Sequence, residues 1–517
     1  MDELVLTGGD LTLDDVWRVA HDGVPVVLAP AAVERMRASR AVIEELVASD
    51  AVVYGVTTGF GDLVSKKISA ADTSRLQENL LISHAVGVGA PHGKHTVRAM
   101  LLLRANALAR GFSGARPEVA ERLLDLLRLN VYPVVPEQGS VGASGDLAPL
   151  AHLALPLIGR GRAEVDGEML DGAAALAKRG LQPLTLGAKE GLALLNGTQQ
   201  MTAIGALVLM HAESLLRTAS VAAAMSVEAL MGTDVAFSDA YQQTRPHPGQ
   251  VMVAAQMRHL LRDSALIKSH HAGSHKVQDP YSIRCVPQVH GAAWDALAHV
   301  RRVLEIEINA VTDNPLVFAD GADVDPAAAA TGGGRVVSGG NFHGEPIALV
   351  MDFMKIAIAE IGSISERRIA QLVDAKSSGL PPFLVKDAGL NSGLMMLQYT
   401  AAALVSENKV LAHPASVDSI PTSAGQEDHV SMGPIAARQA SAIVRNVEHV
   451  VALEILCAAQ GIDFRTESGL TVGAGVAEAH RRVRAKVAHR DDDRDPQPEI
   501  AAAFALVRHG ELADLTD

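Results

Sequence analysis

The residues whose types and spacing could do chemistry begin with a small-residue stretch at positions 139–150. It reads Gly-Ser-Val-Gly-Ala-Ser-Gly-Asp-Leu-Ala-Pro-Leu, and its reactive side chains are hydroxyls and one carboxyl. The ordinary interpretation is a turn in which Ser144 or Asp146 caps a helix that carries Pro149 in its first turn. In a chain with 45 glycines, Ala-Ser-Gly alone favours that interpretation. A chemical role for these residues therefore needs support from motifs elsewhere in the chain.

Three further segments carry polar residues suited to catalysis or binding. The planar guanidinium of Arg284 can bind a carboxylate through two parallel hydrogen bonds, which a lysine cannot do. Tyr54 precedes a glycine-rich run and could act as a base only where its pKa lies below the usual value of about 10. Asn196 precedes Gly197. Each residue also has a structural interpretation. Arg284 could be a surface arginine, Tyr54 a structural tyrosine, and Asn196 part of a glycine-containing interruption near a helix start.

Taken together, these motifs resemble those of the aromatic amino acid ammonia-lyase family. The similarity lies in separated segments whose order along the chain is that of the family, and it spans about residues 53 to 432. The matching segments are residues 54–61, 139–150, 194–198, 277–285, 340–344 and 426–432.

The resemblance implies a prosthetic group made from the chain itself. In this family Ala143, Ser144 and Gly145 cyclise into a 4-methylidene-imidazol-5-one, and no dissociable cofactor is used. In this reaction the amide nitrogen of Gly145 would attack the carbonyl carbon of Ala143, and loss of one water would close the ring. Loss of a second water, which carries away the Ser144 hydroxyl, would leave an alkene. Glycine lacks the Cβ that would block such a compressed backbone. The β-hydrogen of an amino acid is scarcely acidic and ammonium is a poor leaving group, so a strong electrophile is what this chemistry needs.

The resemblance also implies roles for individual side chains. Tyr54 is expected to remove the β-proton, with Asn196 and Tyr281 also catalytic. Gln278, Arg284 and Phe342 are expected to bind the substrate. Phe342 would form an aromatic wall, although it could equally be a core residue. Family members are homotetramers whose pockets combine three subunits, so we expect self-association with shared active sites.

Two places bear on which amino acid is the substrate. The pair Ser83-His84 resembles that of histidine-specific members, and His84 can hydrogen-bond an imidazole. Glu427 stands where phenylalanine-specific members carry an amide, and its carboxylate can accept an imidazole N–H. A structural histidine and a solvated acidic turn are the respective alternatives. The expected activity is the elimination of ammonia from L-histidine to give trans-urocanate, the first step of histidine degradation.

Several alternatives remain open at this stage. A tyrosine or phenylalanine ammonia-lyase, or an aminomutase of the same family, would share most of these motifs. The signature loop of the fumarase and argininosuccinate lyase superfamily does not occur in the sequence. A non-enzymatic helical scaffold would have the mass that its sequence predicts. His270, His271 and His275 include an i, i+4 pair, but no acidic or cysteine ligand adjoins them, so we expect no metal site.

The composition narrows the class of protein. Of the 517 residues, 48% are hydrophobic but only 3% aromatic, which favours helices over strands. A formal net charge of −14 without a basic block argues against nucleic-acid binding. Two cysteines, an acidic N-terminus and no apolar run of about 18–20 residues predict a cytoplasmic protein with no membrane partner.

Apolar residues spaced three or four apart predict the elements that must position these motifs. Long helices are expected at residues 214–231, 292–311, 343–373, 392–412 and 434–459, and they can bury their apolar stripes only against one another. The fold class is therefore mainly α. We predict a smaller, mixed but mostly helical N-terminal domain at residues 1–190, which carries the Ala-Ser-Gly loop. A long-helix bundle and C-terminal segment would follow at 191–517. Residues 319–340 are expected to form an inserted loop, and 486–499 a solvated linker.

Overall fold

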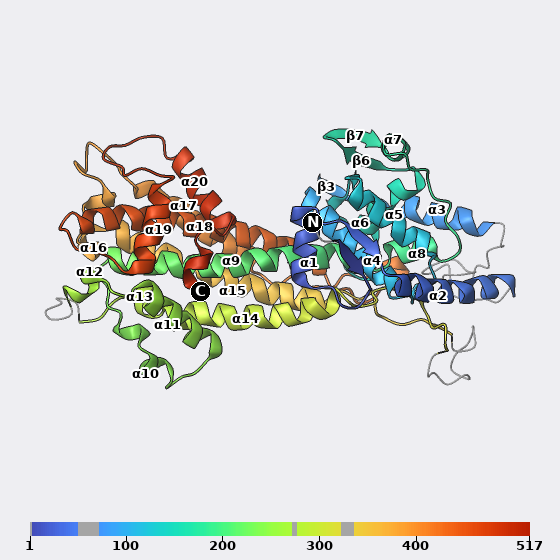
Figure 1. Cartoon of the computed structure of the whole chain (residues 1–517), viewed down its shortest axis with the longest axis horizontal. Helices are drawn as coiled ribbons and strands as arrows, with labels where there is room; N and C mark the ends of the chain where they lie inside the picture. Colours follow the sequence, from blue (N-terminus) through green and yellow to red (C-terminus); the bar gives the residue numbers. More distant parts are fainter. Residues whose placement is uncertain (1–2, 50–71, 271–276, 322–334) are drawn as a thin grey trace. The chain divides into compact units, whose positions relative to one another are not determined.

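The computed structural model describes residues 3–49, 72–270, 277–321 and 335–517 (Figure 1). Helices dominate and the strands are short, so the mainly α class is confirmed. Contacts between Cα atoms divide the chain into two compact units of three segments each. The first unit is Met1–Leu207, Arg302–Met351 and Pro414–Arg438; the second is Val208–Arg301, Asp352–His413 and Gln439–Asp517. The predicted domain boundary near residue 190 is a division of the sequence, whereas these units are defined by contacts between segments far apart in the chain. The boundary therefore stays a prediction.

Two helices that pack against each other supply much of the buried core of the first unit. Helix α4 (Lys94–Ala109) is buried on every side from Val97 onward. Helix α5 (Pro117–Arg128) begins with proline, whose missing N–H is not needed in the first turn. Its buried residues recur at helical spacing, including Val119, Leu123 and Leu127, so one face packs inward.

Short strands complete the first unit. Strands β1 (Leu4–Leu6) and β2 (Val26–Leu28) pair in parallel. Strands β4 (Tyr132–Pro133), β6 (Arg162–Val165) and β7 (Glu168–Asp171) form an antiparallel sheet in that order. The remaining pairs are antiparallel: β3 (Val88–Pro91) with β5 (Pro136–Gln138), and β8 (Leu316–Val317) with β9 (Val336–Val337).

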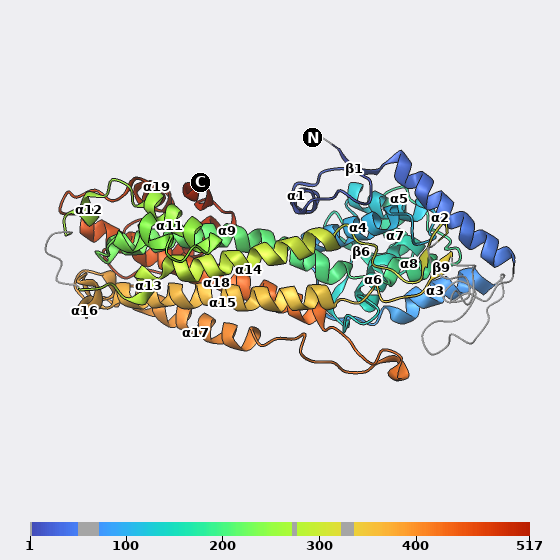
Figure 2. The same ribbon diagram turned by 90° about the horizontal axis from the view of Figure 1, so that it is seen from below.

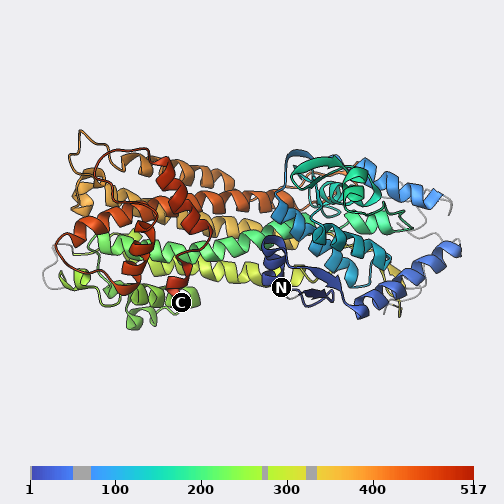
Figure 3. The same ribbon diagram turned by 45° about the horizontal axis from the view of Figure 1, so that its top comes forward.

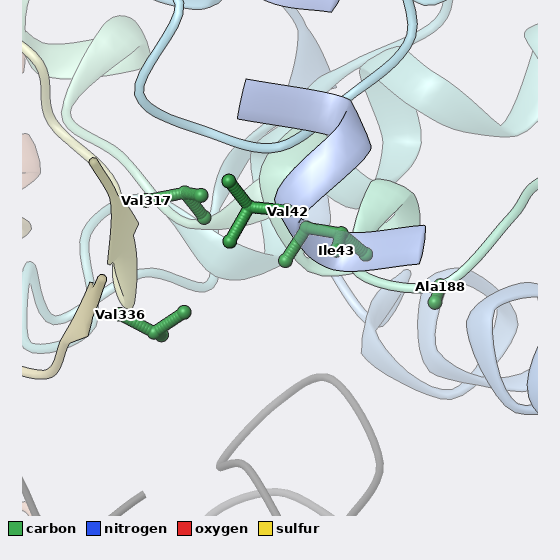
Figure 4. Close-up of a cluster of buried hydrophobic side chains, with 5 residues drawn as sticks. All are labelled: Val42, Ile43, Ala188, Val317 and Val336. Carbon is green, nitrogen blue, oxygen red and sulfur yellow. The ribbon is translucent and has the colours of Figure 1, made fainter. Parts of the chain in front are cut away.

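A small hydrophobic cluster anchors the β8–β9 pair to the rest of the first unit. Val317 and Val336, one from each strand, pack with Val42 and Ile43 of α2 (Pro30–Ala48) and with Ala188 (Figure 4). All five side chains are at most 9% exposed. This cluster fixes where the chain leaves β9 on its way to residue 342.

Long helices form the second unit. Parts of α9 (Gln199–Ala229), α14 (Val286–Glu307), α15 (Glu345–Val373) and α18 (Gly433–Thr466) lie side by side there (Figures 1 and 2). Buried polar contacts join them, such as that of Ser226 in α9 with Glu454 in α18. No helix in the described part of the chain is both long and apolar enough to cross a bilayer.

The predicted helices exist, but several begin earlier than expected. Helix α15 starts two residues after the predicted position, and α17 (Met395–Leu411) lies within its predicted range. Helix α9 begins at Gln199 instead of residue 214. Its N-terminus is stabilised by a carboxylate from a distant part of the chain, as described below, which no local pattern could indicate.

Residues 491–498 of the C-terminal segment are exposed, as expected of the predicted solvated linker, but hydrogen bonds fasten this segment to the rest of the second unit. This segment lies in the red part of the chain in Figure 3. Asp493 accepts hydrogen bonds from the backbone N–H groups of Ser392 (2.7 Å) and Gly393 (2.8 Å). Arg490 is only 4% exposed and pairs with Glu499 at 2.7 Å. The acidic run is therefore partly structural.

Candidate active site

The Ala-Ser-Gly segment lies in a tight loop of the first unit, between β5 and α6 (Leu147–Ala154). Gly142 and Gly145 have φ angles of +69° and +77°, which favour glycine. A Cβ at Gly145 would overlap the backbone of Gly197, with which Gly145 forms an isolated bridge. The N–H of Asp146 donates to the Gly197 carbonyl at 2.6 Å. The loop is thus held against the segment that carries Asn196.

Asp146 follows the tripeptide and is buried. As in the ordinary interpretation of this stretch, it precedes a helix with Pro149 in the first turn, but its side chain makes no capping bond to that helix. Its Oδ2 instead accepts the N–H groups of Gln200 (2.9 Å) and Met201 (3.0 Å) in the first turn of α9. Burial raises the pKa of this carboxyl to about 7, although these hydrogen bonds oppose the shift. Asp146 therefore joins the loop to the start of α9.

Near the start of α9, His92 contacts Gln200 at 2.7 Å between Nε2 atoms. The amide nitrogen of Gln200 can only donate, so Nε2 of His92 accepts and the ring is neutral. Burial, together with the smaller effect of the Arg438 charge, lowers the pKa of His92 to about 4. Protonation would remove the acceptor.

The depressed pKa of His92 predicts a loss of stability in acid. The unfolded state takes up the proton near pH 6.5 and the folded state near 4, so stability falls as the pH drops through this window. Between pH 7.5 and pH 5.5 the titration of His92 should lower the free energy of unfolding by about 1 kcal/mol. Urea unfolding of wild type and His92→Gln should show a smaller acid effect in the variant. Equal pH dependence in both proteins would contradict the assignment.

A second segment of the first unit runs along the loop. Ser431 Oγ donates to the Gly142 carbonyl at 3.0 Å, and the N–H of Met432 donates to the Val141 carbonyl at 2.9 Å. Ala143 packs in a small cluster with Val430 and Met432. These contacts bring the neighbouring Glu427 to the tripeptide.

Glu427 is in direct contact with the central serine. Ser144 Oγ donates to Glu427 Oε1 at 2.8 Å. Thr422 Oγ1 donates to the other carboxylate oxygen, and the Thr422 and Glu427 backbones form an antiparallel bridge. Thr422 thus orients the carboxylate. Sequence reasoning missed it, because nothing near Thr422 indicates that it would face a glutamate five residues on.

His84 ends α3 (Thr73–His84) near this carboxylate. Its Nδ1 lies 2.8 Å from the Leu80 carbonyl, which can only accept, so the proton is on Nδ1 and Nε2 is free of it. Burial lowers the pKa of His84, while the Leu80 bond and the charge of Glu427 partly oppose the shift. Ser83 is exposed, and its Oγ lies 3.1 Å from His84 Nδ1. The structure therefore brings Ser144, Ser83, His84 and Glu427 into one region of the first unit.

Asn196 ends α8 (Glu190–Leu195) and is 5% exposed. Within the described residues its side-chain Oδ1 has no hydrogen-bond partner. Its backbone carbonyl accepts from Nη1 of Arg104 at 3.0 Å, and the same nitrogen lies 3.1 Å from the Thr312 carbonyl. Arg104 is fully buried, which lowers its pKa to about 10. Asn196 thus offers a buried amide oxygen on a firmly held backbone.

Phe342 lies in the segment between β9 and α15 and is partly buried. Two residues later, the N–H of Gly344 donates to the Gly142 carbonyl at 3.2 Å. The segment that carries Phe342 therefore ends at the Ala-Ser-Gly loop.

Three of the other predicted residues, Gln278, Tyr281 and Arg284, lie in the second unit. Tyr281 and Arg284 begin and end α13 (Tyr281–Arg284), and Gln278 is exposed just before it. The Arg284 guanidinium carbon stands 4.6 Å from the centre of the Tyr281 ring, and Nε donates to the Asp279 carbonyl at 3.0 Å. Tyr281 is 71% exposed. The predicted base Tyr54 lies outside the described residues, as do His271 and His275.

A buried ion pair supports α13. Arg368 and Glu454 are both 0% exposed and make two hydrogen bonds, at 2.5 and 2.8 Å. Arg368 Nη1 also donates to the carbonyl of Ser282 in α13 at 3.3 Å. The pair thus ties α15 and α18 to the helix that carries Tyr281.

Because this pair is buried, removing one partner should be costly. Glu454→Gln is expected to lower the free energy of unfolding by about 3 kcal/mol or more, since it leaves Arg368 buried without its counter-charge. The double variant Arg368→Met/Glu454→Leu should lose less. Urea unfolding measures both, with Glu467→Gln as a control that should have little effect, since the Glu467 side chain is 60% exposed and lies 3.4 Å from the exposed Lys386. A double variant less stable than the single one would contradict this account.

Comparisons with known proteins agree with this arrangement. A sequence model of a family described as aromatic amino acid lyase matches residues 11–485. Histidine ammonia-lyase of Gloeobacter violaceus is 54% identical over 517 residues, which is 100% of this chain and 98% of that protein. The crystal structure of histidine ammonia-lyase from Trypanosoma cruzi is 42% identical with a TM-score of 0.90, covering 100% of this chain and 95% of that one. Tyrosine aminomutase from Streptomyces globisporus is 36% identical with a TM-score of 0.91, covering 99% and 98%.

Proposed function

Since this chain belongs to the aromatic amino acid lyase family, we propose that it is a carbon–nitrogen lyase that converts L-histidine to trans-urocanate and ammonia. Relatives that are 50–54% identical along almost the whole chain are histidine ammonia-lyases. The observation that carries the proposal in the structure is the 2.8 Å hydrogen bond between Ser144 and Glu427, with His84 nearby. These groups suit a polar aromatic ring.

The tripeptide fits the prosthetic group of this family. Gly145 lies where a side chain would overlap Gly197, and its positive φ bends the backbone sharply. Ala143 is 4% exposed, so little space is left beside the loop. Ala143, Ser144 and Gly145 would hold the 4-methylidene-imidazol-5-one. When formed, this group supplies an electrophile that withdraws electrons from the bound amino acid.

The chain's own residues would bind and orient the substrate. Arg284 binds the α-carboxylate, because its guanidinium matches the two carboxylate oxygens. His84 with a free Nε2 and Glu427 as a carboxylate are both hydrogen-bond acceptors. Two acceptors suit an imidazole ring that carries N–H groups, whereas a phenyl ring would leave them unpaired. Phe342 contributes an aromatic wall to the same pocket.

In this proposal Tyr54 is the base that removes the β-proton. Its pKa must then lie below the usual value of about 10, so the assembled site has to stabilise the phenolate. Asn196, Tyr281 and Gln278 complete the polar lining. We propose a cytoplasmic homotetramer in which neighbouring subunits bring the residues of the second unit to the loop of the first.

The proposal is tested by incubating the purified protein with L-histidine, L-tyrosine and L-phenylalanine and identifying the products by NMR. Trans-urocanate and ammonia from L-histidine alone support it. Cinnamate or coumarate would indicate another lyase specificity, and a β-amino acid would indicate an aminomutase. Light scattering after gel filtration tests the tetramer of 54.1 kDa chains.

A further inference from the structure

We propose that Asn314 is a positioning residue that holds the segment carrying Phe342 and so sets one wall of the substrate pocket. This inference rests on the function proposed above. Residues 313–315 read Asp-Asn-Pro, which is typical of a turn after a helix. The contacts of Asn314 indicate a more specific role.

The position of Asn314 follows from the β8–β9 pair. Leu316 lies opposite Val337 and Val317 opposite Val336, so residues just before β8 lie near residues just after β9. The valines are held by the core cluster around Val42 (Figure 4). The chain that leaves β9 therefore starts from a fixed point beside Asn314.

Both polar atoms of the Asn314 side chain bind this departing chain. Its Oδ1 accepts the N–H of Gly339 at 2.7 Å, and its Nδ2 donates to Ser338 Oγ at 3.1 Å. Asn314 is 6% exposed, whereas residues 338–341 are exposed. A buried side chain with both hydrogen-bonding groups turned toward an exposed segment anchors that segment to the interior.

The anchor is itself attached to the buried core of the first unit. The N–H of Asn314 donates to Oδ1 of Asp313 at 2.7 Å, and Oδ2 of Asp313 pairs with Lys189 at 2.8 Å. Asp313 and Lys189 are both 0% exposed. Asn314 therefore cannot shift without disturbing a buried ion pair.

Phe342 lies between two fixed points. Asn314 holds residue 339 at one end, and the bond from Gly344 to the Gly142 carbonyl holds the other end at the Ala-Ser-Gly loop. Only residues 340–343 lie between them, so the position of the Phe342 backbone is determined by both anchors. Loss of the Asn314 anchor should loosen the aromatic wall while leaving the loop intact.

The test compares Asn314→Ala with Asn309→Ala. Asn309 belongs to the same unit, and both polar atoms of its side chain are also bonded. It accepts from the N–H of Leu11 (2.9 Å) and donates to the carbonyls of Leu11 (2.8 Å) and Glu305 (3.1 Å). It does not contact the Phe342 segment. The readouts are kcat and KM for L-histidine and amide hydrogen exchange of the peptide that covers residues 336–345.

Asn314→Ala should raise KM about tenfold with kcat within about twofold, the pattern of a lost binding surface. Exchange at residues 336–345 should be faster in this variant and unchanged in Asn309→Ala. Ser338→Ala removes one of the two bonds from an exposed residue, so it should give a smaller change of the same kind even where Asn314→Ala folds poorly.

Wild-type KM and exchange in Asn314→Ala, or equal effects of the two asparagine variants, would overturn the inference. So would a fall in kcat alone, because that would indicate an effect on the chemical step. An inactive wild type would instead count against the proposed function, and the exchange measurement would still decide whether Asn314 holds the segment.

Discussion

Ser144→Ala is expected to lose turnover of L-histidine by at least about a thousandfold, because no other side chain in the loop can supply the alkene of the electrophile. The helices should remain folded, since the serine hydroxyl contacts only the Glu427 carboxylate among the described residues. Circular dichroism checks the fold and urocanate formation checks the activity.

Intact-mass measurement separates loss of the prosthetic group from other causes of inactivity. The wild-type chain should weigh two waters less than its sequence predicts, whereas Ser144→Ala should weigh what its sequence predicts. Ser39→Ala is the matched control, since Ser39 is buried and, among the residues that the structure describes, its hydroxyl bonds only to the Met36 carbonyl of its own helix, at 3.1 Å. It should keep both the mass deficit and the activity. An active Ser144→Ala protein without the deficit would exclude the assigned electrophile.

The elements that could be predicted are those whose ends are set by nearby residues. Helix α15 begins two residues from the predicted start, because its apolar spacing and the glycine before it are local signals. Helix α9 begins at Gln199, because Asp146 accepts the N–H groups of its first turn from more than 50 residues away. The helix propensities of residues 199–213 carry no information about that contact. Long-range capping is thus where local reasoning fails.

The same distinction applies to the site. The motifs identify Ser144, Glu427 and His84 one by one, and the fold brings them together from three separate segments. The residues that orient them carry no sequence signal: Thr422 and Arg104 belong to no motif. Such residues can be found only from the folded structure, because they lie far along the sequence from, or outside any motif with, the residues that they orient. Asn314 shows the intermediate case, since its motif is visible but its partner Gly339 is not.

Glu427→Gln should reduce kcat/KM for L-histidine about 100-fold, with little change in stability. In the uncyclised chain the amide can still accept from Ser144, so the contact that Glu427 makes with the loop can persist until the Ser144 hydroxyl is lost. What disappears is the negative charge, and a hydrogen bond to a charged group contributes about 1.5–3 kcal/mol, or roughly 10–150-fold. Steady-state kinetics at pH 8 measures the loss, and thermal unfolding measures the stability.

The control for this prediction is Asp428→Asn, which removes one charge from the adjacent residue. Asp428 is exposed, whereas Glu427 is partly buried between Ser144 and Thr422. If net charge near the pocket were what mattered, the two variants would lose similar activity. If the acceptor that faces the imidazole is what matters, only Glu427→Gln loses it, and L-phenylalanine should be discriminated against less strongly than in the wild type. Equal losses in both variants would remove Glu427 from the selectivity argument, because only a specific contact can distinguish neighbouring carboxylates.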